Sequence, residues 1–282
     1  MLKPLDLAAS QGVIRADSAG EARAALRRIA AILERVQRLP RRKRWSPGSR
    51  RPHSRGAERI LVERYIPGVE VAVEGLLVDG RLRVLAVFDK PDPLEGPFFE
   101  ETLYVTPSRL SPGAAAAVQR TAAAAVAALG LVHGSVHAEL RLNAGGVWPL
   151  EAAPRSIGGL CSRSLRFGRG GEVSLEELIL RHALGLPVAG LHRERRAAGV
   201  MMIPVPAAGV LASVERQDEA AAVAGIEEVV IAVPAGHPVA PPPEGGRYLG
   251  FLFARAATPA AVEAALRGAH ARLRIDIRPA RE

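Results

Sequence analysis

The chain has 282 residues, of which 48% are hydrophobic and 4% aromatic, enough for one large or two ordinary domains with mainly aliphatic cores. Its net charge of +9 is local, because residues 35–59 hold ten Lys or Arg and one Glu, while the rest holds 28 basic and 28 acidic residues. A single cysteine excludes a disulfide framework, no apolar run reaches the ~20 residues of a membrane helix, and the start lacks the apolar core of a secretory signal. A soluble cytoplasmic protein without a membrane partner is expected.

The first part of the chain predicts a short strand, a loop and a helix. The stretch "LKPLDLAASQGVI" reads as an extended piece followed by a loop of small residues that ends at Gly12. Residues 17–36 are expected to form a helix, because Ser18 and Glu21 form a capping box and apolar residues recur at helical spacing. Residues 37–58 contain three prolines and no apolar periodicity, so we expect a flexible basic loop there.

The centre of the chain predicts two hairpins and two helices. Residues 60–90 read as a strand, a turn and a hairpin hinged on Asp79-Gly80, and a loop with one short strand follows. Residues 111–129 form an Ala-rich helix, a second hairpin comes next, and Ser174 caps a further helix.

The last part of the chain has a different pattern. Strand-like alternation begins near residue 197, and a helix follows with Thr258 as its N-cap and Pro259 at its first position. A polar, Pro-containing stretch separates this part from the rest. We therefore expect one domain over residues 1–190 and a second over residues 197–282.

The second hairpin, "GSVHAELRLNAGGVWPLEAAPRSIGG", carries one glutamate on each strand. Folding it about Gly145, with a three-residue loop from Ala144 to Gly146, places Glu139 opposite Glu151. Residues opposite each other on antiparallel strands lie about 4.5–5.5 Å apart at Cβ, so two like charges would repel there. The hairpin alone leaves two interpretations open, a solvated polar face or a divalent cation that both carboxylates bind.

The two faces of this hairpin differ in polarity, as is typical of an antiparallel sheet. The expected packed face consists of Val136, Ala138, Leu140, Leu142, Trp148, Leu150 and Ala152. The expected polar face consists of His137, Glu139, Arg141, Glu151 and Ala153. Carboxylate oxygens suit Mg²⁺, and the "PRSIGG" that follows, with Arg155, suits an anionic group. His137 is a candidate substrate contact near this site, whereas Cys161 is expected to be a buried small residue.

The motif "HAEL…LEAAPR" resembles that of the ATP-grasp superfamily, and more closely that of its carboxylate–amine ligases of the L-amino-acid ligase type. Ala153 stands where many members have a metal-binding Asn, which disfavours the biotin-carboxylase branch. The resemblance implies an α+β ATP-grasp fold, in which two α+β lobes sandwich ATP, followed by a smaller C-terminal α/β domain.

Three other stretches resemble the same family in the same order. They are "LKPLDLAASQGV", which is similar to the family's strand lysine and small-residue phosphate loop, "ILVERYIPGVEV", which resembles its adenine hinge, and "FDKPDPLEGPFFEET", which is similar to its segment over the active site. The resemblance implies ATP and Mg²⁺ (or Mn²⁺) as cofactors, with the metal on Glu139 and Glu151. It implies that Lys3 contacts ATP phosphates, that Glu63 takes the adenine amino group, that Tyr65 and Ile66 offer backbone groups, and that Glu70 holds the ribose. It also implies catalytic roles for Lys90 and Arg155, which contact phosphate or substrate.

The activity that the resemblance implies is ATP-dependent formation of C–N bonds. ATP would phosphorylate a substrate carboxylate to an acylphosphate, and an amine would then displace phosphate. The expected partners are small-molecule carboxylates and amines, of a kind that the motifs do not specify, and a homodimer stays open. The family places an α/β domain before the first strand, whereas this chain starts at that strand. We therefore expect the chain alone to bind MgATP weakly and to make little amide.

Two other functions are weighed against ligation. One is a truncated, non-catalytic ATP-grasp protein that binds only nucleotide or a partner. The other is nucleic-acid binding through residues 35–59, whose clustered charge would attract phosphates. Only Trp45 could stack on bases within that segment, so nucleic acid is disfavoured as a partner.

Overall fold

A computed structural model describes residues 1–38 and 59–280 of the chain. Most of the segment predicted to be a flexible loop, residues 37–58, lies outside the described residues; its first two residues belong to a helix. No helix within the described ranges is long and apolar enough to cross a membrane.

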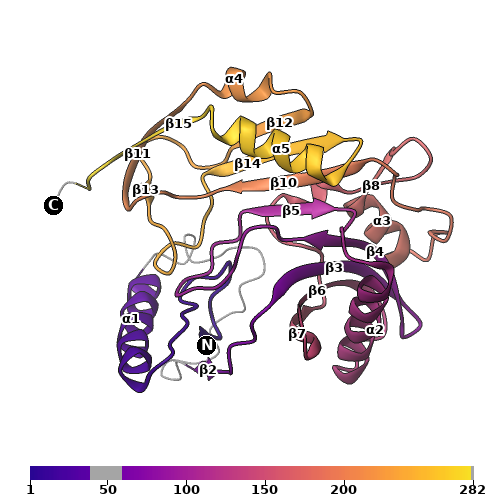
Figure 1. The fold of residues 1–282 in the computed structure, drawn as a ribbon, viewed down its shortest axis with the longest axis horizontal. Helices are drawn as coiled ribbons and strands as arrows, with labels where there is room; N and C mark the ends of the chain where they lie inside the picture. The colour runs from indigo at the N-terminus through magenta and orange to yellow at the C-terminus, as the bar shows by residue number, and fades with distance from the viewer. Residues whose placement is uncertain (39–58, 281–282) are drawn as a thin grey trace.

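Eight antiparallel strands form the main sheet (Figure 1). In their order across the sheet they are β12 (Ile226–Ile231), β14 (Gly250–Ala256), β10 (Ala197–Ile203), β5 (Leu103–Thr106), β4 (Arg81–Asp89), β3 (Val69–Val78), β6 (Gly134–Asn143) and β7 (Gly146–Ala153). Strand β6 is therefore an interior strand, and β7 lies at the edge of the sheet.

Smaller elements surround this sheet. Those before β10 are β1 (Leu2–Pro4), α1 (Ala19–Arg38), β2 (Ile60–Val62), α2 (Pro112–Ala128), the 3-10 helix η2 (Cys161–Ser164), β8 (Arg166–Phe167), β9 (Val173–Ser174) and α3 (Leu175–Ala183). Those after β10 are β11 (Gly209–Glu215), α4 (Gln217–Ala221), β13 (Pro238–Val239), α5 (Pro259–His270) and β15 (Arg274–Arg278). Strand β11 and helix α4 were not predicted from the sequence.

Local sequence explains where the helices begin. At the start of α1, the Glu21 amide donates to Ser18 Oγ and the Ser18 amide donates to Glu21 Oε2, so the predicted capping box is confirmed. The Ala261 amide donates to the Thr258 hydroxyl at the start of α5. Asp79 and Gly80 both have positive φ, as the two-residue turn between β3 and β4 requires.

The two faces of the main sheet pack on different helices. In β3, Val71, Val73 and Leu77 belong to a core with α2, whereas Ala72 and Leu76 belong to a core on the other face with residues of η2 and α3. Helix α5 packs on β10 and β14, so it covers the C-terminal part of the sheet, while α2 covers the part around β7 (Figure 1). The face with Ala72 also carries the polar side chains described below.

The proposed domain boundary does not divide the sheet. Strand β10 begins the second predicted domain, yet it pairs with β5 from the first part of the chain, with Val200 opposite Tyr104. The two predicted domains thus share one continuous sheet. The small lobe of α1 and the β1–β2 pair lies apart from it, with its own apolar core around Ile29 (Figure 1).

The second hairpin reaches the predicted pairing by another route. The expected three-residue loop is wrong, because Asn143 pairs with Gly146 across a two-residue turn. With that turn alone, Glu139 would lie opposite Leu150. A bulge shifts the register next to Glu139, so Glu139 does lie opposite Glu151.

The bulge also changes which side chains pack near the turn. Val147 packs against the apolar core, whereas Trp148, which we expected on the packed face, is 44% exposed. The buried residues of that face, Val136, Ala138 and Leu140, are as predicted. A register shift of one residue moves the side chains of a strand to the opposite face of the sheet. Because the bulge restores the predicted register at Glu151, the prediction is wrong only between the turn and the bulge.

Candidate functional site

Polar side chains of β3 and β6 face each other in register on one face of the sheet. Glu70 lies opposite Arg141, and Glu74 lies opposite His137. Between these two pairs, the small Ala72 lies opposite Glu139. Because side chains alternate between the two faces of a strand, this single register brings all of these charges to one face.

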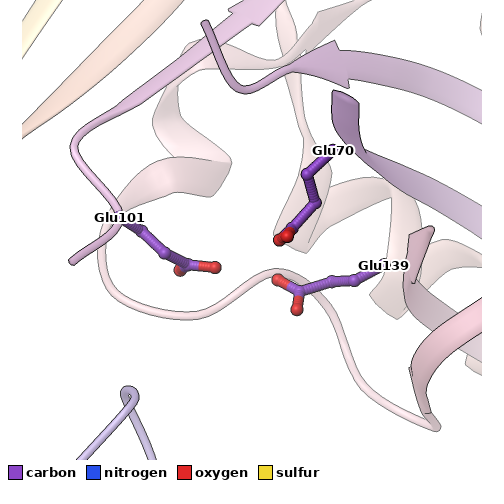
Figure 2. Close-up of side chains that lie close together, drawn as sticks. All are labelled: Glu70, Glu101 and Glu139. Atoms are coloured by element: carbon purple, nitrogen blue, oxygen red, sulfur yellow. The ribbon is translucent and has the colours of Figure 1, made fainter. Parts of the chain in front are cut away.

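Lys90 lies at the centre of three carboxylates. Its ammonium is 2.7 Å from Glu70 Oε1, 2.6 Å from Glu101 Oε1 and 2.8 Å from Glu139 Oε1, and the side chain is only 3% exposed. Figure 2 shows the three carboxylates converging from β3, from the segment before β5 and from β6. We call this set of Lys90, Glu70, Glu101 and Glu139 the acidic cluster.

The pKa values of the groups in the acidic cluster are shifted in different directions. Burial alone would lower the pKa of Lys90, but attraction by Glu101 and Glu139 outweighs it and raises that pKa well above its usual value. Burial raises the pKa of Glu101 to about 7, against the attraction of Lys90. Burial also disfavours the charge on Glu139, but Lys90 and the nearby His137 hold the pKa of Glu139 well below its usual range. At neutral pH, Glu139 is thus the firm anion and Glu101 can gain or lose a proton.

A chain of contacts extends from Glu139 into the core. His137 Nε2 is 3.6 Å from Glu139 Oε1, and its Nδ1 is 2.9 Å from Glu74 Oε2. Burial opposes the charged imidazole, yet the nearby Glu139 and the hydrogen bond with Glu74 raise the pKa of His137 to about 9. The other oxygen of Glu74 accepts from the Ile157 amide at 2.9 Å. These contacts therefore also fix the position of the segment after Arg155.

Arg141 connects the acidic cluster to the segment predicted to bind adenine. Its Nε donates to Glu70 Oε2 at 2.8 Å, and its Nη1 donates to the Ile66 carbonyl at 2.7 Å. Its guanidinium lies 5.1 Å from the centre of the Tyr65 ring, close enough for a cation–π contact. The predicted hinge residues Tyr65 and Ile66 are therefore held against the same charged network as Lys90.

Lys3 and Glu63 lie together on the small lobe. Lys3 on β1 is opposite Leu61 of β2, and its ammonium is 2.7 Å from Glu63 Oε2. Both side chains are about one-third exposed, at 30% and 38%. The lysine predicted to contact phosphates is therefore ion-paired with the glutamate predicted to bind adenine.

Glu151 and Arg155 lie at the rim of the site. The Glu151 side chain is 60% exposed and the Arg155 side chain 46%, with 3.9 Å between Glu151 Oε1 and Arg155 Nη2. Glu151 thus lies opposite Glu139 but is not among the carboxylates whose oxygens converge, Glu70, Glu101 and Glu139. Its role as a metal ligand stays a prediction.

Two functional candidates escaped the sequence analysis. Glu101 lies in the irregular segment after Lys90, and only the fold brings its carboxylate to the Lys90 ammonium. Glu74 did leave a signal: "VEVAVEGLLV" places Glu70 and Glu74 on one face of an otherwise apolar strand. Cys161 is buried, as predicted, and burial raises the pKa of its thiol, which disfavours a reactive thiolate.

The donor set suits a hard divalent cation. One oxygen from each of Glu70, Glu101 and Glu139 lies within 4.8 Å of the others, and carboxylate oxygens are the ligands that Mg²⁺ and Mn²⁺ prefer. The Lys90 ammonium already lies among these three oxygens, Arg141 pairs with Glu70, and His137 lies beside Glu139. A metal ion would therefore bind all three oxygens only in place of the Lys90 ammonium. A cavity of about 660 Å³ lies elsewhere, between α1 and residues 95–98, and none of its lining residues belongs to the predicted site.

Comparison with known protein families divides the chain into two matches. Residues 1–164 match the family described as ATP-grasp domain, and residues 201–278 match the family described as L-amino acid ligase C-terminal domain 2. The two matches lie on either side of residues 191–196, which separate the two predicted domains.

Similar proteins include ligases and carboxylases. The crystal structure of an L-amino acid ligase from Bacillus licheniformis is 28% identical with a TM-score of 0.78, covering 98% of this chain and 64% of that one. Carnosine synthase 1 from Gallus gallus is 36% identical over 148 residues, which is 51% of this chain and 16% of that protein. The biotin carboxylase domain of 2-oxoglutarate carboxylase from Hydrogenobacter thermophilus is 17% identical with a TM-score of 0.59, covering 98% of this chain and 57% of that one. The last similarity concerns the fold alone, and this chain spans less than two thirds of each of these proteins.

Proposed function

The chain belongs to the ATP-grasp family, and from this premise we propose that it serves an ATP-dependent carboxylate–amine ligase that joins amino acids through an acylphosphate. Its mixed α+β ATP-grasp fold, with a C-terminal part of the L-amino acid ligase type, is the one predicted from the sequence. The observation that carries the proposal is the acidic cluster, which places a buried lysine and a titratable carboxylate beside Glu139.

ATP would bind between the small lobe and the main sheet. Lys3 would contact phosphates after exchanging its partner Glu63, which its partial exposure allows, and Glu63 would then be available to the adenine amino group. Tyr65 and Ile66 would offer backbone groups, as predicted. Glu70 needs a revised proposal, because both of its oxygens are ion-paired, so a ribose contact would require it to release Lys90 or Arg141.

Mg²⁺ or Mn²⁺ would be held by Glu139 and, across the strand pair, Glu151, with Glu101 near enough to compete for it. When bound, the metal would neutralise charge on the phosphates of ATP. Glu139 suits this role because Lys90 and His137 keep it ionised, which a metal ligand must be.

The chain's own residues would do the rest by position and charge. A substrate carboxylate oxygen attacks the γ-phosphorus of ATP, and ADP leaves. Lys90 and Arg155 would stabilise negative charge on the transferred phosphoryl group. The amine nitrogen then attacks the acyl carbon, the C–O bond to phosphate breaks, and a proton leaves the nitrogen. Glu101 could accept that proton near neutral pH, because its pKa of about 7 suits a general base.

A second candidate is nucleotide binding without ligation. It is favoured by the full engagement of Lys90, whose ammonium is already surrounded by three carboxylates.

The test combines calorimetric titration with MgATP and phosphate release in the presence of free L-amino acids. Amino-acid-dependent ADP formation with a dipeptide product supports ligation by this chain. MgATP binding without product supports the second candidate, and the absence of binding at millimolar nucleotide overturns both. Glu151→Gln should abolish ATP turnover with the fold intact, and Glu176→Gln, on the exposed side of α3, is the matched control.

A further inference from the structure

A loop from the C-terminal part of the chain forms hydrogen bonds with the small lobe. Residues 240–246 connect β13 to β14 and extend to α1, as the descending loop in Figure 1 shows. The Pro243 carbonyl accepts from the Gly12 amide at 2.9 Å, and the Glu244 carbonyl accepts from Gln11 Nε2 at 2.8 Å. We call residues 240–246 the clasp.

The side chain of Glu244 adds a charged contact to the clasp. Its two oxygens accept from Arg28 Nε at 2.5 Å and from Arg28 Nη2 at 2.9 Å. Such a bidentate pair fixes direction as well as distance. Arg35, two helical turns further along α1, donates to the Glu244 carbonyl at 2.7 Å. The hydrogen bond from Arg28 lowers the pKa of Glu244, as expected for a carboxylate that stays ionised.

Sequence explains why the clasp has this shape. A Cβ on Gly245 would lie 1.7 Å from the Ala240 carbonyl oxygen, so only glycine fits the tight turn there. Gly246 leaves room for Gln11, whose Oε1 would lie 3.2 Å from a Cβ at that position. The sequence "APPPEGG" is thus specific for a loop that closes on itself and accommodates Gln11.

The clasp contacts a segment whose backbone conformation is strained. Ala9, Ser10 and Gly12 all have φ between 55° and 75°, a conformation that residues other than glycine rarely adopt. Such a conformation persists only where surrounding contacts determine it. The contacts from Pro243 and Glu244 act on Gly12 and Gln11, at the end of this segment.

We propose that Glu244 is a positioning residue of the nucleotide site: through the clasp, the C-terminal part of the chain fixes the 8–12 loop in the shape that receives the phosphates of ATP. This inference rests on the proposed function, in which Lys3 of β1 contacts nucleotide phosphates, and on the resemblance of the loop after this strand to the family's phosphate loop. It assigns the C-terminal part a role in nucleotide binding as well as in packing, because Arg28, Gln11 and Gly12 all contact it directly.

The experiment uses the full chain and the variant Glu244→Gln, which keeps the backbone carbonyl but weakens the pair with Arg28. The amide exchange of Gly12 should accelerate about five- to thirty-fold, the change in population that 1–2 kcal/mol produces. The dissociation constant for MgATP should rise at least about threefold, because a smaller fraction of the protein has a competent loop. The affinity for adenosine, which has no phosphates, should not change.

The control is Glu228→Gln, which weakens the exposed pair with Arg163 at 3.0 Å and does not change the clasp. Glu244→Asp should recover part of the MgATP affinity. Unchanged MgATP affinity in Glu244→Gln overturns the inference, and so does equal weakening of MgATP and adenosine, which would indicate a general loss of structure. If the unmodified chain binds no MgATP, the proposed function fails together with this role of Glu244. If it binds MgATP and the variant binds it equally well, only the inference fails.

Discussion

The two glutamates of the second hairpin occupy opposite positions in one strand pair but have different surroundings. Glu139 on the interior strand β6 contacts Lys90, His137 and Tyr104, whereas Glu151 on the edge strand β7 is 60% exposed and lies 3.9 Å from Arg155. The interior carboxylate is fixed and ionised before any ligand arrives, and the edge carboxylate is free to adjust. Although the two glutamates lie opposite each other, Glu139 is therefore preorganised for a ligand, whereas Glu151 can change its conformation when a ligand binds.

We expect the largest effect on the free energy of unfolding for Lys90→Met, which removes the cation of the interior cluster. It leaves Glu70, Glu101 and Glu139 converging without their ammonium, and an uncompensated buried charge typically costs about 3–5 kcal/mol. We expect the free energy of unfolding, measured in urea at pH 7, to fall by that amount. Arg155→Met, at the exposed rim, should change it by no more than about 0.5 kcal/mol. Similar effects of the two variants would mean that the interior cluster is not held by Lys90.

The next largest effect concerns pH and Glu101. Its folded pKa of about 7 exceeds the ordinary 4.5, so between these values the folded protein binds more protons than the unfolded chain. The free energy of unfolding should therefore fall by about 3 kcal/mol as pH rises from about 4.5 to about 7. Glu101→Gln should remove this fall, measured by urea unfolding across that range in the presence of EDTA.

His137 provides a control with a different window. Its folded pKa of about 9 exceeds the ordinary 6.5, so its contribution to stability is present below pH 6.5 and lost as pH rises through about 9. Glu101→Gln should leave that later fall in place, and His137→Gln should remove it. A Glu101→Gln protein with an unaltered profile below pH 7 would show that Glu101 is ionised throughout.

The fold could be predicted further than the site because its signals are local. The capping residues Ser18 and Thr258, the Asp79-Gly80 turn and the alternation in β6 each depend on a few neighbouring residues. The acidic cluster depends instead on the pairing of β3 with β6 and on an irregular segment that carries Glu101, and neither leaves a local pattern. The pairing of Glu139 with Glu151 was predicted correctly, but through a loop that is wrong and a bulge that was not foreseen.

Glu139→Gln and Glu151→Gln sharpen the comparison directly. Glu139→Gln weakens the contacts to Lys90 and His137 and should cost about 1–3 kcal/mol of unfolding free energy, the range for a buried charged partner left unsatisfied. Glu151→Gln should stay within about 0.5 kcal/mol of the unmodified chain. Both should weaken Mg²⁺-dependent ATP binding, followed by calorimetry with and without EDTA. Equal stability of the two variants would remove the distinction between interior and edge.

The smallest effect is expected for Tyr104→Phe, which tests a single contact on the interior side. The Tyr104 hydroxyl donates to Glu139 Oε1 at 3.3 Å, a long hydrogen bond, so its loss should cost no more than about 0.5–1.5 kcal/mol. The ring would keep its edge contact with Phe88 and its place 4.9 Å from the Lys90 ammonium, so packing and cation–π attraction should persist. Because Lys90 and His137 still hold Glu139, metal-dependent ATP binding should be almost unchanged. A loss of binding comparable to that of Glu139→Gln would show that the hydroxyl, rather than the two cationic partners, fixes the interior carboxylate.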